Sequence, residues 1–305
     1  MNEIRISLFS CLDLRAPGDQ RLVLPNRRVE ELLCFLLLNR DQLHSRESLA
    51  DLLWPEATVG RGRSYLRKAL WQLQRVMSGQ SHDPASRSAD EESGEAHWLV
   101  VRPEWISVSN QAGLCLDVAA FEAAYGSAVN TAGCDLSAQT ALELQQAINL
   151  YRGDLLENWY CEWLLVDRER LQLAYIILLE KLMGYSEAHA QIEAGLAYGF
   201  RILQLDPAHE RAHRLLMRFY QQAGRPAAAI RQYELCASIL ARELGVSPSQ
   251  KTIGLYDEIL RREPEGRIVP DTPPAQVEIW TRLDTLQAAI IQAEEEVQAL
   301  RALLI

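Results

Sequence analysis

Apolar and polar residues alternate in the first stretch of the chain, EIRISLFSCLDLRA, and again in QRLVLP, with the turn-forming APGDQ between them. A period of two is typical of β-strands, so the pattern predicts a small antiparallel sheet. The alternation returns in HWLVV and WISVS, which flank RPE. This second pair predicts a β-hairpin with Arg102 near its tip.

Between these strand patterns, apolar residues recur at spacings of three and four over 27–40, 45–54 and 57–77. This spacing predicts three helices. Ser45 is suited to cap the second helix, which the Trp54-Pro55 pair ends. A sheet, three helices and a hairpin follow one another in a winged helix-turn-helix. We therefore expect such a domain over residues 1–110.

Helical spacing then continues almost without a break, and it predicts an all-helical domain over residues 114–261. A tetratricopeptide frame of about 34 residues fits this segment twice. The positions that the frame requires to be apolar or small are Leu179, Leu182, Met183, Gly195, Leu216, Met217, Tyr220, Ala229 and Tyr233. The expected fold is therefore mainly α, with a small β part in the winged helix.

The end of the chain combines a proline-rich stretch, 262–276, with a regular apolar repeat over 277–305. The first part predicts a linker. In the second, spacings of four and three alternate, which predicts a coiled coil through which two chains dimerise. Its apolar positions are Ile279, Leu283, Leu286, Ile290, Ala293, Val297, Leu300 and Leu304. The alternative is that this stripe docks onto the helical domain of its own chain.

Charge is distributed unevenly along a chain whose formal net charge is -10. Residues 1–110 are almost neutral, so the acidic excess lies in the remainder. The segment 78–96 is rich in Ser, Gly and acidic residues, and this composition predicts a mobile acidic loop. The helix over 57–77, in contrast, contains arginines and a lysine but no acidic residue. A polyanion would be attracted most readily to this helix.

On a helical wheel, Leu66, Leu70, Leu73 and Met77 occupy one face of this third helix, which must pack inward. The opposite face is polar and basic, and with the hairpin arginine it forms the candidate DNA-binding set. Its members are Arg61, Arg63, Ser64, Arg67, Lys68, Gln72, Arg75 and Arg102. Cations suit phosphates, and forked or amide donors suit base edges in the major groove.

The alternative is a merely solvated basic face. Three features favour DNA: the absence of a local neutralising acid, a preceding helix at helix-turn-helix spacing, and a hairpin that can act as a wing. Trp71 also lies on the polar side, where an aromatic residue more often packs partly against a neighbouring element than against a ligand. We therefore do not include Trp71 among the residues expected to contact bases.

The segment SRESLADLLWPEATVGRGRSYLRKALWQLQRVM resembles the DNA-binding domain of the Streptomyces antibiotic regulatory protein family. The bacterial transcriptional activator domain of the same family is resembled by DVAAFEAAY, AINLYRGDLLENWYCEWLLVDRERLQ, LDPAHERAHRLLMRFYQQAGRPAAAIRQYE and LARELGVSPSQKTIGLYDEIL. The resemblance covers about residues 4–260. It implies a transcriptional activator that binds repeats in double-stranded promoter DNA and recruits RNA polymerase.

Two features depart from the family pattern: the long acidic loop and the C-terminal heptads. The loop could compete with DNA for the basic helix, whereas the heptads suggest a constitutive homodimer. No GxxxxGK phosphate loop occurs, so the ATPase module of the family's large members is absent from this sequence.

A different function is suggested by arginines in the helical domain, which could bind an anionic effector such as a nucleotide or phosphopeptide. These are Arg211, Arg214, Arg218, Arg225 and Arg231. The alternative is that they pair with acids such as Glu210 and Glu234 on the surface. A third possibility is a protein-interaction adaptor that has lost DNA binding.

Other classes of protein are not favoured. The six cysteines contain no CxxC pair and have no histidine at metal-ligand spacing, so we expect reduced thiols, no metal and no cofactor. Ser64 and Cys161 lack a placed general base, and no enzyme is expected. No apolar run is long enough for a membrane span, and the expected location is the bacterial cytoplasm, at the nucleoid when the protein is bound to DNA.

Overall fold

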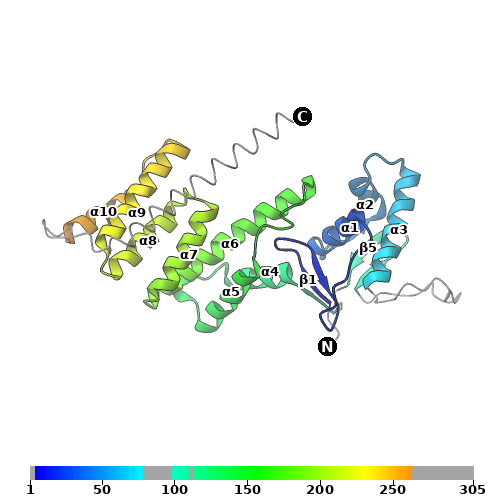
Figure 1. The fold of residues 1–305 in the computed structure, drawn as a ribbon, viewed down its shortest axis with the longest axis horizontal. Coiled ribbons are helices and arrows are strands. Elements are labelled where there is room, and N and C mark those ends of the chain that lie inside the picture. Colours follow the sequence, from blue (N-terminus) through cyan, green and yellow to red (C-terminus); the bar gives the residue numbers. More distant parts are fainter. Residues whose placement is uncertain (1–3, 78–97, 110–112, 263–305) are drawn as a thin grey trace. The chain divides into compact units, whose positions relative to one another are not determined.

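The computed structural model describes residues 4–77, 98–109 and 113–262. These residues divide into two compact units, the first up to Leu215 and the second from Leu216. Figure 1 shows their helices and strands in chain order. The described part is mainly helical with two small sheets, which confirms the predicted fold class. The predicted acidic loop, the linker beyond Arg262 and the coiled coil lie outside the described residues. Among the helices of the described ranges, none is both long and apolar enough to cross a membrane.

The first sheet contains β1 (Ile4–Ser7), β2 (Asp13–Arg15) and β6 (Leu114–Leu116) in the order β2-β1-β6. β2 pairs with β1 antiparallel and β6 pairs with it parallel. The prediction of a second strand in QRLVLP is wrong, because Arg21 makes only an isolated bridge with Arg15. The first alternating stretch itself contains the turn: Ser10 has a φ of 70°, and the chain reverses before β2.

The winged helix follows as α1 (Arg27–Leu38), α2 (Arg46–Leu53) and α3 (Val59–Met77). Figure 1 shows these helices side by side next to β5. The second sheet has the order β3-β5-β4, with β3 (His44–Ser45), β4 (Leu99–Val101) and β5 (Trp105–Val108). As predicted, the Ser45 side chain caps α2 by accepting from the Ser48 N–H at 3.0 Å. The predicted element order of a winged helix-turn-helix is confirmed.

The helical part of the first unit comprises α4 (Asp117–Ala128), a 3₁₀ turn η1 (Gly133–Asp135), α5 (Ala138–Leu150), α6 (Glu162–Ala188) and α7 (Ile192–Leu205). The helix α8 (Glu210–Gln222) begins in this unit and ends in the second one. Phe121, Leu144 and Leu171 are fully buried in the core between these helices. Leu179, Leu182 and Met183 are buried too, as the tetratricopeptide frame requires.

The second unit continues with α9 (Pro226–Ile239), a π-helical turn η2 (Leu240–Leu244) and α10 (Gln250–Arg262). Its small core contains Met217, Ala229, Leu255 and Ile259. At its edge the rings of Tyr233 and Tyr256 stack with their centroids 4.0 Å apart. Apolar side chains at tetratricopeptide positions thus pack helix on helix in this unit as well.

Within the first unit, one segment of the winged helix pairs with one segment of the helical part, and the sequence did not predict this pairing. Residues 8–10 pair with residues 154–157 through backbone hydrogen bonds of 2.9 Å from Ser10 to Asp154, from Leu156 to Leu8 and from Glu157 to Ser10. Arg168, on α6, holds the segment around residues 154–159 in place. Its guanidinium donates to the carbonyls of Leu155, Leu156 and Trp159 at 3.1, 2.9 and 3.1 Å.

Asp117 holds the other segment of this junction. Its carboxylate accepts the backbone N–H groups of Leu8 and Phe9, at 2.9 and 3.2 Å. Burial raises the pKa of the Asp117 carboxyl, although these backbone N–H groups oppose the shift by favouring the charged form. The first residue of α4 therefore holds the segment that follows β1, and it provides acceptors for two backbone N–H groups of that segment.

Candidate nucleic-acid interface

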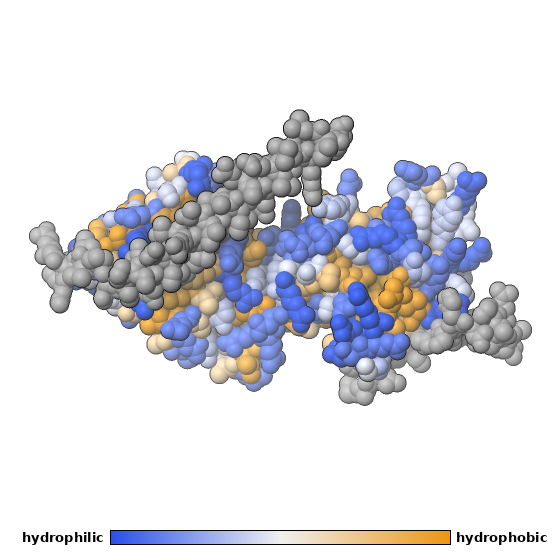
Figure 2. Space-filling view, in the orientation of Figure 1, coloured by the Kyte–Doolittle hydropathy of each residue, from blue (hydrophilic) through white to orange (hydrophobic). Residues whose placement is uncertain are grey.

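The basic helix α3 is fixed in the winged helix by one apolar face. Leu66, Leu70, Leu73 and Met77 are buried, as the helical wheel predicts, and Ala69 is buried beside them. The described side chains of α3 include no acid. Burial of this stripe leaves the cationic side of the helix facing outward, and Figure 2 shows mainly hydrophilic and intermediate side chains over the end of the first unit where α2 and α3 lie.

Most residues of the predicted DNA-binding set lie on this outward side. Arg61, Arg63, Ser64, Arg67 and Lys68 are exposed, whereas Gln72 and Arg75 are half-buried. Gln72 accepts a long hydrogen bond of 3.5 Å from the side chain of Asn26, the N-cap residue of α1. The structure thus brings together the helix members of the set, with Gln72 turned toward α1.

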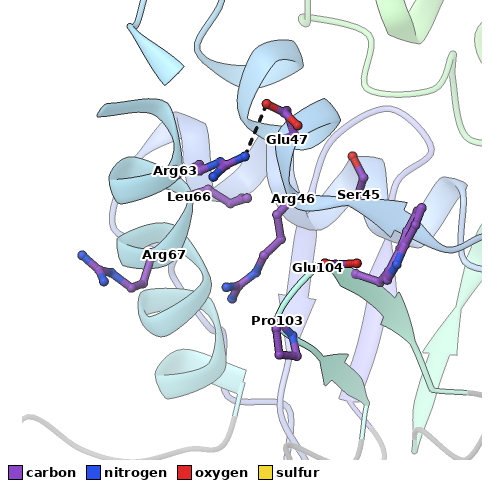
Figure 3. Close-up of a pocket in the computed structure, with 9 residues that line it drawn as sticks. Ser45, Arg46, Glu47, Arg63, Leu66, Arg67, Pro103 and Glu104 are labelled. Carbon is purple, nitrogen blue, oxygen red and sulfur yellow. Dashed lines mark hydrogen bonds and ion pairs between the residues drawn. The ribbon is translucent and has the colours of Figure 1, made fainter. Parts of the chain in front are cut away.

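The expectation that no nearby acid neutralises these cations is wrong for one of them. Arg63 forms an ion pair of 3.4 Å with Glu47, in the first turn of α2 (Figure 3). Both side chains are more than half exposed, at 59% and 58%. Such an exposed pair contributes at most about 1 kcal/mol. Arg63 can therefore exchange Glu47 for a phosphate at little cost.

A groove of about 490 Å³ lies between α3, the start of α2 and the hairpin. Its lining residues are Ser45, Arg46, Glu47, Arg63, Leu66, Arg67, Pro103, Glu104 and Trp105. Figure 3 shows Arg46 extending from the start of α2 into the space between α3 and Pro103. Arg67 points from α3 toward the outside. An open groove with cations on two of its walls can accept a phosphate backbone.

Arg46 is a residue that the sequence analysis missed. Its backbone N–H donates to the Glu104 carbonyl at 3.0 Å, which ties the start of α2 to the hairpin. Its side-chain Nε is buried and has no hydrogen-bond partner among the described residues. The signal that could have revealed it is its position as the first residue of the helix before the basic one, where helix-turn-helix proteins approach the DNA backbone.

The hairpin places Arg102 as the sequence predicted, exposed in the turn between β4 and β5. The backbone N–H of Arg102 donates to the Trp105 carbonyl at 2.8 Å and closes this turn. Arg102 is not part of the groove lining, so it lies at the tip of the wing and outside the groove. This position is suited to contact with DNA beside the major groove.

The sequence and fold of this chain are similar to those of known proteins. The model of the bacterial transcriptional activator domain matches residues 116–260. The transcriptional regulatory protein MoaR1 of Mycobacterium tuberculosis is 23% identical, over 90% of this chain and 85% of its own length. The chain thus contains a bacterial transcriptional activator domain and is similar along most of its length to a transcriptional regulator. The family resemblance inferred from the sequence is thereby confirmed.

A second relative in this family of regulators is the transcriptional regulatory protein EmbR of Mycobacterium tuberculosis. It is 23% identical over 76% of this chain, which spans only 57% of EmbR. The solved structure of EmbR in complex with a low-affinity phosphopeptide has a TM-score of 0.63 at 20% identity, covering 87% of this chain and 67% of that one. At this identity the comparison shows that the fold is shared.

The arginines predicted to bind an effector in this regulator are distributed over both units. Arg211 and Arg214 belong to the first unit, and Arg218, Arg225 and Arg231 to the second. Arg211 lies 3.4 Å from Glu180, which also lies 3.5 Å from His209. Arg214 lies 4.0 Å from Glu210. Arg211 and Arg214 thus have acidic neighbours, as in the alternative of surface ion pairs.

Proposed function

We propose that this chain is a sequence-specific DNA-binding transcriptional regulator, an activator that binds promoter repeats as a dimer and contacts RNA polymerase. The observation that carries the proposal is the outward side of α3, where Arg61, Arg67 and Lys68 are exposed and no acid is present. A helix with this surface, preceded by α2 and followed by a wing, has the parts that a helix-turn-helix protein brings to the major groove. The similarity to transcriptional regulatory proteins supports the regulatory role.

The groove beside α3 supports the same proposal. Arg46 in the groove and Arg67 on the outer side of α3 would contact phosphates from two elements, while Ser64 and Gln72 carry groups that hydrogen-bond base edges. Arg102 would contact the backbone or minor groove from the wing. The protein would act in the cytoplasm, at the nucleoid when bound to DNA.

A selection experiment tests whether this surface recognises sequence. The full chain is incubated with a pool of random duplexes, and the retained DNA is sequenced after several rounds. We expect enrichment of a motif that occurs as a repeat, because a dimer places two α3 helices on one side of the duplex at a fixed spacing. Retention of DNA without an enriched motif would contradict sequence recognition, and no retention at low salt would contradict DNA binding itself.

Dimerisation through residues 277–305 is part of this proposal. The heptad pattern supports it, and two apolar positions near the middle provide the test. Leu286→Glu together with Ile290→Glu is expected to halve the mass measured by light scattering, because two charges per chain would lie in the apolar seam. Gln298→Glu, at an outward heptad position, is the control and should leave the mass unchanged. A wild-type mass equal to the 34.5 kDa of one chain would exclude the dimer.

Two alternative functions would use other parts of the chain. An effector-gated regulator would bind an anion through the arginines of the helical domain, and the phosphopeptide complex of EmbR makes a phosphopeptide the first ligand to test. An adaptor without DNA binding would have no use for the exposed cations of α3. The acidic neighbours of Arg211 and Arg214 and the exposure of Arg61, Arg67 and Lys68 on α3 favour DNA as the principal ligand.

A further inference from the structure

Trp71 lies at the centre of the outward side of α3. Ser64, Lys68, Trp71 and Arg75 follow one another at spacings of four, three and four, so they form one stripe along the helix. This stripe is opposite the buried one that contains Leu66 and Leu73, as the steps of about 100° per residue require. Trp71 is 57% exposed. It is therefore the most exposed large apolar side chain among the described side chains of α3.

The neighbours of Trp71 are cationic. Arg67 and Lys68 precede it by four and three residues, and Arg75 follows it by four, so all three lie next to it on the helix surface. The Arg75 guanidinium carbon is 5.3 Å from the centre of the indole ring. An apolar protein surface that docked on Trp71 would have to desolvate these charges, which is costly. A ligand that fits this site must combine negative charge with a small apolar group.

DNA presents this combination in its major groove. Phosphates line the groove, and the 5-methyl group of thymine is the apolar group that distinguishes a T·A pair on the groove floor. We propose that Trp71 is a specificity-determining residue that recognises a thymine by contact between the indole ring and this methyl group. The inference rests on the proposed function and adds to it recognition of the thymine methyl group, which the polar groups of Ser64 and Gln72 do not supply. Arg75 would keep the ring in place by its cation–π contact.

The test removes the methyl group and keeps the hydrogen bonds of the base. In the duplex motif obtained by selection, each thymine is replaced in turn by deoxyuridine, and affinity for the full chain is measured by fluorescence anisotropy. For the wild type we expect about a four-fold loss at one position of each half-site, the value of one buried methyl group. Trp71→Ala should bind the thymine and deoxyuridine duplexes with equal affinity. Trp71→Phe, which keeps an apolar ring, should retain a preference for thymine.

The variants separate the role of Trp71 from its effects on folding and from the proposed function. Because the side chain is exposed, Trp71→Ala should have the same midpoint of urea unfolding as the wild type. Equal sensitivity to deoxyuridine in the wild type and Trp71→Ala, or no sensitive position in either, would overturn the role of Trp71 while leaving DNA binding in place. A selected motif without a fixed T·A pair would overturn it too. Failure of the wild type to bind any duplex would overturn the proposed function and this inference together.

Discussion

Replacing Arg61, Arg67 and Lys68 together by alanine removes three phosphate contacts from each subunit of the dimer, and it is expected to weaken binding to the selected duplex by roughly 10⁴-fold at about 0.15 M salt. The three side chains are exposed on α3, and each is expected to neutralise one phosphate. Each lost phosphate contact removes the free energy of counterion release, which at this ionic strength corresponds to about five-fold in affinity. Fluorescence anisotropy with a labelled duplex measures the effect.

A matched control removes the same number of charges from a different part of the chain. Arg211, Arg225 and Arg231 are also exposed, and they lie in the helical domain. Their replacement by alanine changes the net charge equally, so it should alter DNA affinity by less than about three-fold, through long-range electrostatics alone. A loss as large as that of the α3 variant would mean that overall charge sets the affinity, and that α3 is not the DNA-binding helix.

Replacing Arg168 by alanine is expected to lower the free energy of unfolding by about 3–5 kcal/mol. Its guanidinium donates to the carbonyls of Leu155, Leu156 and Trp159, so truncation leaves three carbonyls without this donor. Leu155 and Leu156 are fully buried, and water cannot readily replace the lost hydrogen bonds. Urea unfolding followed by circular dichroism measures the change, which should appear as a lower midpoint.

Arg170, two residues along the same helix, provides the control. It pairs with Glu122 at 2.7 Å and with Asp167 at 3.0 Å, and its side chain is 47% exposed. Arg170→Ala should therefore cost no more than about 1 kcal/mol. Equal losses in the two variants would show that Arg168 acts as an ordinary surface charge. In that case the junction between the winged helix and the helical part would not depend on it.

The elements of the winged helix could be predicted from the sequence because each depends on local information. The apolar stripe of α3 follows from side-chain spacing, and the cap of α2 follows from Ser45 preceding a helical pattern. The helical spacing predicted helices in the second half of the chain, and the resemblance to a family predicted which domain these helices form. The family model then matched residues 116–260.

Contacts between distant residues could not be predicted in the same way. The parallel pairing of β6 with β1 joins Leu114 to Ile4, and no local pattern indicates such a partner. The pairing of Glu47 with Arg63 depends on how α2 and α3 cross, so the sequence analysis treated the basic face as unopposed. The place of Arg46 in the groove depends likewise on the hairpin reaching the start of α2.

The exposure of Trp71 is a further property that the sequence did not predict. The wheel placed it on the polar side of the helix, but the general behaviour of aromatic residues argued for partial packing. Its exposed fraction of 57% became known only from the arrangement of α3 among its neighbours. Exposure and surrounding charge together, and neither alone, make it a candidate for base recognition.

The salt dependence of DNA binding tests the central claim that α3 binds the DNA backbone. If each subunit of a dimer neutralises about four phosphates, a plot of log affinity against log salt should have a slope near -7, at about -0.9 per phosphate. The variant with alanine at Arg61, Arg67 and Lys68 removes three of these contacts per subunit, so its slope should be shallower by about 5. The same slope in the wild type and the variant would contradict the account, because the phosphate contacts would then lie elsewhere on the protein.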